Sequence, residues 1–93
     1  MQSKKAFVID LVQTDDHFQR LLPGPPNTCG MKSGRVYLKP GDSCGIHSTQ
    51  QKEEQLVFLH GQGQAIIKGE ILTVGKEKVV YIPPNTEHDI KNT

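Results

Sequence analysis

The sequence predicts an all-β fold of short antiparallel strands. Nine glycines and six prolines divide the 93 residues into short segments, several of them rich in β-branched residues, and helix signals are almost absent. Turns recur at intervals of about 6–14 residues, which is typical of a sandwich or barrel. We expect strands at Ala6–Val12, Arg35–Leu38, Gln55–His60, Gln64–Lys68, Glu70–Val74, Lys78–Ile82 and His88–Lys91.

We expect a single domain in which the N-terminal third and the rest of the chain have different roles. Residues 1–33 would supply N-terminal strands and a loop of the barrel, and residues 34–93 hold the segments that carry chemistry. The stretch Pro23–Thr28 predicts a loop, because it combines three prolines with a glycine and an asparagine. One helical turn over Asp15–Leu21 is a minor expectation, with Asp15 or Asp16 as its N-cap.

Charge and hydropathy exclude several classes of partner. The net charge is +1, with 11 basic and 10 acidic residues spread along the chain, and no basic block is present to follow a phosphate backbone. No apolar stretch reaches the ~18–20 residues that cross a bilayer. The first residues also lack the long apolar run of a signal peptide. We therefore expect no nucleic acid, no membrane association and a cytoplasmic location.

The two cysteines, Cys29 and Cys44, lack the CxxC spacing of a zinc ribbon or a redox motif. In a cytoplasmic protein they are expected to stay reduced as structural thiols. A disulfide between them and a role for Cys44 in a binding site remain the two alternatives.

Three residues that bind metals well are placed where strands begin or end. Glu54 opens an apolar run and shares a face with Leu56 and Phe58, so its carboxylate would enter the barrel at its mouth. A buried carboxylate is costly unless it is paired or bound to a cation. His88 begins the last predicted strand, and His47 lies in the loop before Glu54. Two imidazoles and one carboxylate from separate segments therefore form a candidate metal site.

The spacing of these residues resembles the cupin superfamily. The first cupin motif has a glycine, five residues, His-x-His, three or four residues, a glutamate, six residues and a glycine. Here it corresponds to Gly41, His47-Ser48-Thr49, Glu54 and Gly61.

The second cupin motif runs roughly Pro-x-Gly, two residues, His, three residues, Asn. Here it corresponds to Pro83-Pro84-Asn85, His88 and Asn92. The resemblance spans Gly34–Asn92 and implies a cupin jelly-roll β-barrel of antiparallel strands. It also implies a divalent metal ion (Fe, Ni, Mn, Cu or Zn) held by His47, Glu54 and His88.

Two departures from the cupin pattern bear on the site. Asn85 stands where the second motif has glycine, which is tolerable because asparagine also reaches left-handed backbone angles. Thr49 stands where the first motif has its second histidine, and its neutral hydroxyl is a poor ligand. The loss either opens a coordination position on a two-histidine, one-carboxylate site or leaves a degenerate site that holds another ligand or none.

Four further residues are candidates to line the site. Thr49 shares a face with His47, and His60 has the strand parity of Glu54, although a place on the rim is the simpler interpretation of His60. Arg35 and Tyr37 share a face on the strand before the first motif, where either would contact an acidic or polar substrate.

The sequence also favours a homodimer. The runs Leu56–Leu59 and Val79–Ile82 are apolar on both faces, so each face needs a cover. The chain stops at Thr93, one residue beyond the second motif, where a cupin barrel normally continues with another strand. We therefore expect either a shortened chain or a strand supplied by a partner, with Ala6–Val12 as the candidate for exchange.

Two functions remain open at this point. The resemblance implies a metal-dependent oxygenase or isomerase acting on a small polar organic molecule. The alternative is a non-catalytic cupin that binds or senses a small-molecule ligand, such as a sugar or a small acid. The resemblance to a fold family does not decide between them.

Overall fold

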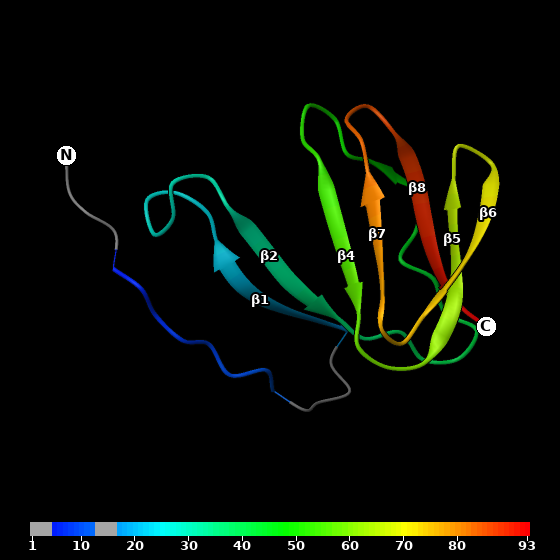
Figure 1. Cartoon of the computed structure of the whole chain (residues 1–93), viewed down its shortest axis with the longest axis horizontal. Helices are drawn as coiled ribbons and strands as arrows, with labels where there is room; N and C mark the ends of the chain where they lie inside the picture. Colours follow the sequence, from blue (N-terminus) through cyan, green and yellow to red (C-terminus); the bar gives the residue numbers. More distant parts are fainter. Residues whose placement is uncertain (1–4, 13–16) are drawn as a thin grey trace. The chain divides into compact units, whose positions relative to one another are not determined.

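A computed structural model describes residues 5–12 and 17–93, and every regular element in these ranges is a strand (Figure 1). The prediction of an all-β fold is confirmed. The chain divides into two compact units, Met1–Tyr37 and Leu38–Thr93. The strands are β1 (Phe18–Pro23), β2 (Lys32–Val36), β3 (His47–Ser48), β4 (Glu54–Phe58), β5 (Gln62–Ile67), β6 (Glu70–Gly75), β7 (Lys78–Ile82) and β8 (Glu87–Asn92).

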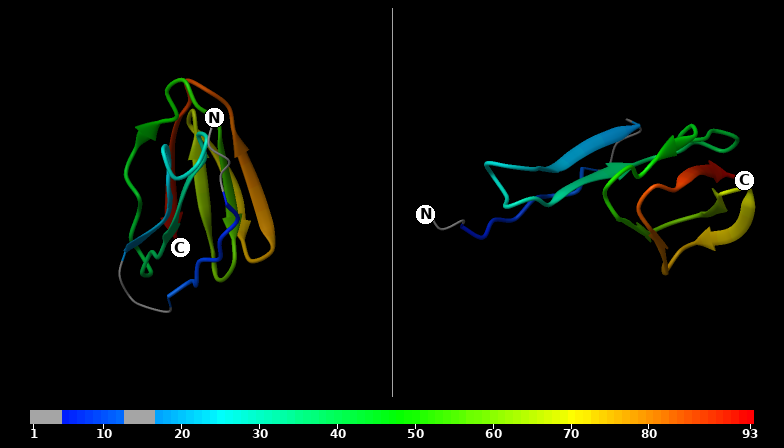
Figure 2. Two further views of the ribbon diagram at one scale, coloured as in Figure 1. Left: turned by 90° about the vertical axis from the view of Figure 1, so that its left-hand side faces the viewer. Right: turned by 90° about the horizontal axis from the view of Figure 1, so that it is seen from above.

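The second unit contains two antiparallel sheets. One has four strands in the order β3-β8-β5-β6, and the other pairs β4 with β7. The five strands predicted within this unit from the turn residues all occur, with bounds that differ by at most two residues. Seen from above, the strands of this unit enclose a common interior (Figure 2, right).

The interior of the second unit is filled from both sheets. Ala65, Val74 and Ile90 form its buried centre, and Leu56 and Phe58 of β4 are among the half-buried side chains that pack against them. Burial alternates along β4, half-buried at residues 54, 56 and 58 and exposed at residues 55 and 57. Glu54 therefore shares the inward face with Leu56 and Phe58, as the strand period predicts.

Two positions in the second unit show constraints on the backbone. Gly63 pairs with Val74 of β6 and with Asn92 of β8, and a Cβ at this position would clash with the carbonyl oxygen of Lys91. Asn85 in the turn between β7 and β8 has a φ of 56°, in the left-handed region. Asparagine can therefore take the place of the glycine at this turn.

Two predictions for the first unit are wrong. Residues Phe18–Leu21, expected in a helical turn, lie in β1 and pair with β2. Its expected caps, Asp15 and Asp16, lie outside the described residues. The predicted strand Ala6–Val12 is also absent, because no backbone ladder forms there. The side chain of Gln19 joins this segment to β1 instead, because its Oε1 accepts from the amide of Val12 and its Nε2 donates to the carbonyl of Asp10.

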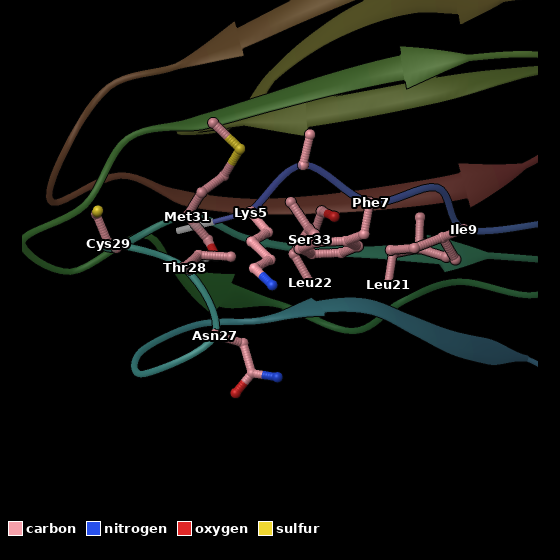
Figure 3. Close-up of a pocket in the computed structure, with 12 residues that line it drawn as sticks. Lys5, Phe7, Ile9, Leu21, Leu22, Asn27, Thr28, Cys29, Met31 and Ser33 are labelled. Atoms are coloured by element: carbon pink, nitrogen blue, oxygen red, sulfur yellow. Dashed lines mark hydrogen bonds between the residues drawn. The ribbon is translucent and has the colours of Figure 1, made fainter. Parts of the chain in front are cut away.

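An open cleft lies between residues 5–9 and the β1–β2 hairpin (Figure 3). Its lining is mostly apolar, with Phe7, Leu21 and Met31 among the side chains, and it includes no histidine or carboxylate. It therefore lacks the chemistry expected of the site. Over the described residues, no helix is long and apolar enough to cross a bilayer.

Candidate metal site

Three strands of the second unit bring His47, Glu54 and His88 together. His47 on β3 and His88 on β8 are direct cross-strand partners, so their side chains leave the four-stranded sheet on the same face. Glu54 opens β4 in the other sheet. One potential ligand atom from each of the three residues lies within 4.8 Å of the others. The cluster thus joins the two sheets across the end of the interior.

The imidazole of His88 is held in one orientation. His88 is 2% exposed, and its Nδ1 lies 3.0 Å from the carbonyl oxygen of Thr86. A carbonyl oxygen only accepts hydrogen bonds, so Nδ1 is the donor and carries the hydrogen. In the neutral ring, Nε2 is then left with a free lone pair.

That Nε2 atom lies 3.0 Å from Oε2 of Glu54, yet it is buried without a hydrogen-bond partner. Two acceptor atoms that face each other at this distance repel unless a positive charge lies between them or beside them. An unpaired buried polar atom is costly, so its position calls for an explanation. A proton on Nε2 would complete an ion pair with Glu54, and a metal cation bound by both atoms would equally give each of them a partner.

His47 repeats the arrangement at the solvent-exposed side of the cluster. Its Nδ1 lies 3.0 Å from the carbonyl oxygen of Gly45, and this bond again leaves Nε2 as the acceptor. The rings of His47 and His88 meet edge to face, with their centroids 4.2 Å apart. Both imidazoles therefore bond a backbone carbonyl two residues earlier through Nδ1 and keep Nε2 as a potential ligand atom.

These donors fit a divalent transition metal. Two imidazole nitrogens and one carboxylate are the ligands of many zinc sites and of the non-haem iron facial triad. Ligand atoms around such an ion lie about 3.0–3.5 Å apart, which matches the distance between His88 and Glu54. The three residues differ in burial. His88 is enclosed, the Glu54 side chain is 36% exposed and His47 is exposed. The cluster is therefore open to solvent on the His47 side.

Thr49 does not offer a free hydroxyl to this cluster. Its Oγ1 donates to the carbonyl oxygen of Pro83 at 2.7 Å and accepts from the amide of Thr86 at 3.1 Å. The residue that replaces the family's histidine therefore ties the first motif to the second.

The other candidate lining residues are placed differently. His60 follows β4, is exposed and is not part of the metal-ligand cluster. Arg35 on β2 and Tyr37 just after it belong to the first unit, where both are half-buried and the amide of Tyr37 donates to the carbonyl of His17. Their contact with a substrate stays a prediction.

Both cysteines are free thiols in this structure. Cys29 is exposed, whereas Cys44 is half-buried against the interior of the second unit. Burial raises the pKa of the Cys44 thiol, and the nearby carboxylates of Asp89 and Glu54 raise it further. A raised pKa disfavours the thiolate, which is the nucleophilic form of cysteine.

Sequence reasoning missed Asp89, which is 6% exposed and accepts a hydrogen bond at 2.9 Å from the amide of Gly45. A carboxylate next to a histidine on a strand is expected on the opposite, solvated face. The loop before β3 covers that face, and no local sequence pattern predicts the contact between Gly45 and Asp89.

Curated relatives resemble part of this chain. A mannose-1-phosphate guanylyltransferase of Salmonella typhimurium and one of Escherichia coli are each 28% identical to it over 58 residues. The match covers 62% of this chain but only 12% of either relative.

Solved structures resemble the chain in fold. A protein from Photorhabdus luminescens (TM-score 0.76, 18% identity) and a cupin 2 conserved barrel domain protein from Salinispora arenicola (0.74, 24%) each cover 95% of this chain. The match covers 78% and 79% of those two chains. A predicted oxalate decarboxylase from Thermotoga maritima has a TM-score of 0.62 at 28% identity, over 64% of this chain and 52% of its own.

The family profile described as "Cupin domain" matches residues 34–93, the range that contains both motifs and all three residues of the cluster. The chain belongs to the cupin family.

Proposed function

We propose that this protein binds a divalent metal ion through His47, Glu54 and His88 and uses it to bind and convert a small organic acid or a similar polar molecule. The observation that carries the proposal is the buried Nε2 of His88, which makes no hydrogen bond and lies 3.0 Å from the carboxylate of Glu54. An ion bound there would give both acceptor atoms a partner.

The three residues of the cluster would have different roles because they differ in burial. His88 anchors the enclosed side of the site, while His47 and the part-exposed Glu54 leave the opposite side open to an incoming molecule. Three protein ligands leave a coordination position for a substrate, as in catalytic metal sites. A bound ion would supply a Lewis acid or, with iron, an oxygen-activating centre, which suits an isomerase or an oxygenase. The likeness to a predicted oxalate decarboxylase favours a small carboxylate as the ligand.

The alternative is a non-catalytic module that binds a sugar or a small acid. It is supported by the match to mannose-1-phosphate guanylyltransferases, in which the shared stretch is a small part of a longer enzyme. In that case the site would orient a ligand without converting it.

Elemental analysis of the purified, untagged protein tests the metal site, followed by calorimetric titration of the metal-free protein with Zn²⁺, Mn²⁺, Fe²⁺, Ni²⁺ and Cu²⁺. We expect about one ion per chain. Glu54→Gln, which keeps the shape but removes the charge, should weaken binding at least tenfold. A parent protein that contains no metal and takes none up would refute the metal site.

The metal-loaded protein then separates the two functions. Incubation with a panel of small carboxylic acids and sugars, with products followed by mass spectrometry, should show conversion of an acid if the protein is an enzyme. Saturable binding without conversion would favour the binding module.

We also propose that the protein is a cytoplasmic homodimer. The second unit exposes Val57, Val79 and Tyr81, each more than half accessible, on the outer face of the β4–β7 sheet. Val57 and Val79 are direct partners in that sheet, so they form one continuous apolar stripe. A stripe of this kind is a candidate surface for a second copy.

A further inference from the structure

The backbone segment that orients each imidazole is held by a side chain from the other motif. For His88, the acceptor is the carbonyl oxygen of Thr86. Thr49 of the first motif binds this residue twice, because its Oγ1 accepts from the Thr86 amide at 3.1 Å and its own amide donates to the Thr86 carbonyl at 3.2 Å. The Thr49 hydroxyl also donates to Pro83 at 2.7 Å, so it anchors the turn before β8 at two points.

His47 has the mirrored arrangement. Its acceptor is the carbonyl oxygen of Gly45. The amide of Gly45 donates to Oδ1 of Asp89, which lies in the second motif and is 6% exposed. A buried carboxylate makes a rigid anchor, since moving away would cost it the bond that compensates for its burial.

We propose that Thr49 and Asp89 are positioning residues, each fixing the orientation and tautomer of the imidazole in the opposite motif. Thr49 fixes His88 through Thr86, and Asp89 fixes His47 through Gly45. Groups that hold a ligand's second nitrogen set which ring atom faces the ion, and their loss weakens metal binding. At position 49 the chain therefore has an anchor for a metal ligand in place of a further ligand.

This role differs measurably from simple support of a turn. A threonine that only stabilised the turn before β8 would change the unfolding free energy and leave the tautomer of His88 as it was. Loss of a positioning residue, in contrast, changes the tautomer of the histidine in protein that remains folded. The crossed arrangement adds a second distinction, because changes at Thr49 should act on His88 and changes at Asp89 on His47.

The test is nitrogen NMR of ¹⁵N-histidine-labelled, metal-free protein, at a pH well above the usual imidazole pKa. In the parent, both His47 and His88 should show the tautomer with hydrogen on Nδ1. Thr49→Val keeps the side-chain shape but removes the hydroxyl, so His88 should become a mixture of tautomers while His47 stays unchanged. Thr49→Ser keeps the hydroxyl and should resemble the parent.

The role of Asp89 is tested with the same nitrogen NMR measurement. Asp89→Asn retains an acceptor oxygen for the Gly45 amide and should keep the parental tautomer at His47. Asp89→Ala removes the acceptor and should give a mixture at His47. Parent protein with hydrogen on Nε2 of His88 would overturn the proposal, and so would folded Thr49→Val and Asp89→Ala variants with parental tautomers. If Thr49→Val fails to fold, the parent spectrum and the Asp89 variants decide.

A second readout rests on the proposed metal site. Titration of the metal-free proteins with Zn²⁺ should show binding about 10–100-fold weaker in Thr49→Val than in the parent, and within about threefold of the parent in Thr49→Ser. Absence of binding to the parent would refute the proposed function alone, since the tautomers are measured without metal. Equal affinity in parent and Thr49→Val, together with parental tautomers, would refute the positioning role alone.

Discussion

His47 and His88 are direct partners in the β3–β8 ladder, and their rings meet edge to face at 62° with centroids 4.2 Å apart. Their environments nevertheless differ, because His88 is 2% exposed and His47 is exposed. One imidazole is thus part of the packed interior and the other lies on the rim. Loss of either should abolish the metal site, but the cost in stability should differ.

His47→Ala should remove metal binding while changing the free energy of unfolding by less than about 0.5 kcal/mol, as expected for an exposed side chain. His88→Ala should also remove metal binding but cost about 2–4 kcal/mol, because it leaves a cavity and removes one of the two hydrogen bonds that the Thr86 carbonyl accepts. Denaturant unfolding of the metal-free proteins gives the stability, and calorimetry gives the affinity. Parental affinity in a folded His47→Ala variant would exclude His47 as a ligand.

The sequence predicted the second unit well because its signals are local. Glycine and proline turns separate its strands, and the inward alternation of β4 placed Glu54 beside Leu56 and Phe58. The spacing of His47, Glu54 and His88 then matched a known pattern. Their closeness in space depends on how the two sheets face each other, which no local pattern shows.

The first unit was predicted poorly because its structure depends on pairing partners. The apolar residues of Ala6–Val12 suggested a strand, but a strand needs a ladder, and Gln19 binds this segment through its side chain. β3 was missed because two residues are too short to give a period, and it exists through its pairing with β8. The roles of Thr49 and Asp89 likewise depend on bonds between residues 37 and 44 positions apart.

Gly63 is expected to be intolerant of any side chain. Its Cβ position is filled by the carbonyl of Lys91 in the neighbouring strand β8, which cannot move without breaking the ladder. Gly63→Ala should therefore cost about 2–3 kcal/mol in denaturant unfolding. Gly30→Ala is the control, because nothing lies within 4 Å of the added carbon, and its effect should stay within about 0.5 kcal/mol. Equal stabilities of the two variants would show that β5 and β8 can separate more easily than the structure indicates.

Tyr81 should ionise at a higher pH than an ordinary tyrosine. Its hydroxyl donates to the carboxylate of Glu53, and this bond is the main cause of its raised pKa, with smaller contributions from desolvation and the charge of Glu53. A pKa raised by folding stabilises the protein below the usual tyrosine pKa of about 10, and this contribution is lost as the pH rises through the higher folded-state value.

Ultraviolet absorbance of tyrosinate, measured across an alkaline titration in a Tyr37→Phe background, isolates Tyr81. Glu53→Gln should lower the pKa of Tyr81 toward the ordinary value, because the charged acceptor is gone. An unchanged titration curve in that variant would mean that the Tyr81–Glu53 bond does not persist in solution.

The apolar stripe on the outer face of the β4–β7 sheet should form part of a dimer interface. Val57 is 59% exposed, and its cross-strand partner Val79 is 57% exposed, so a lysine at position 57 would be solvated in a monomer but buried without a partner in a dimer. Val57→Lys should therefore convert a dimer to a monomer in size-exclusion chromatography with light scattering, with little change in strand content by circular dichroism.

Ile71→Lys is a matched control, since Ile71 on β6 is 60% exposed but lies in the other sheet. Dissociation by Ile71→Lys and not by Val57→Lys would place the interface on the four-stranded sheet, and a parent that is already monomeric would rule out the dimer.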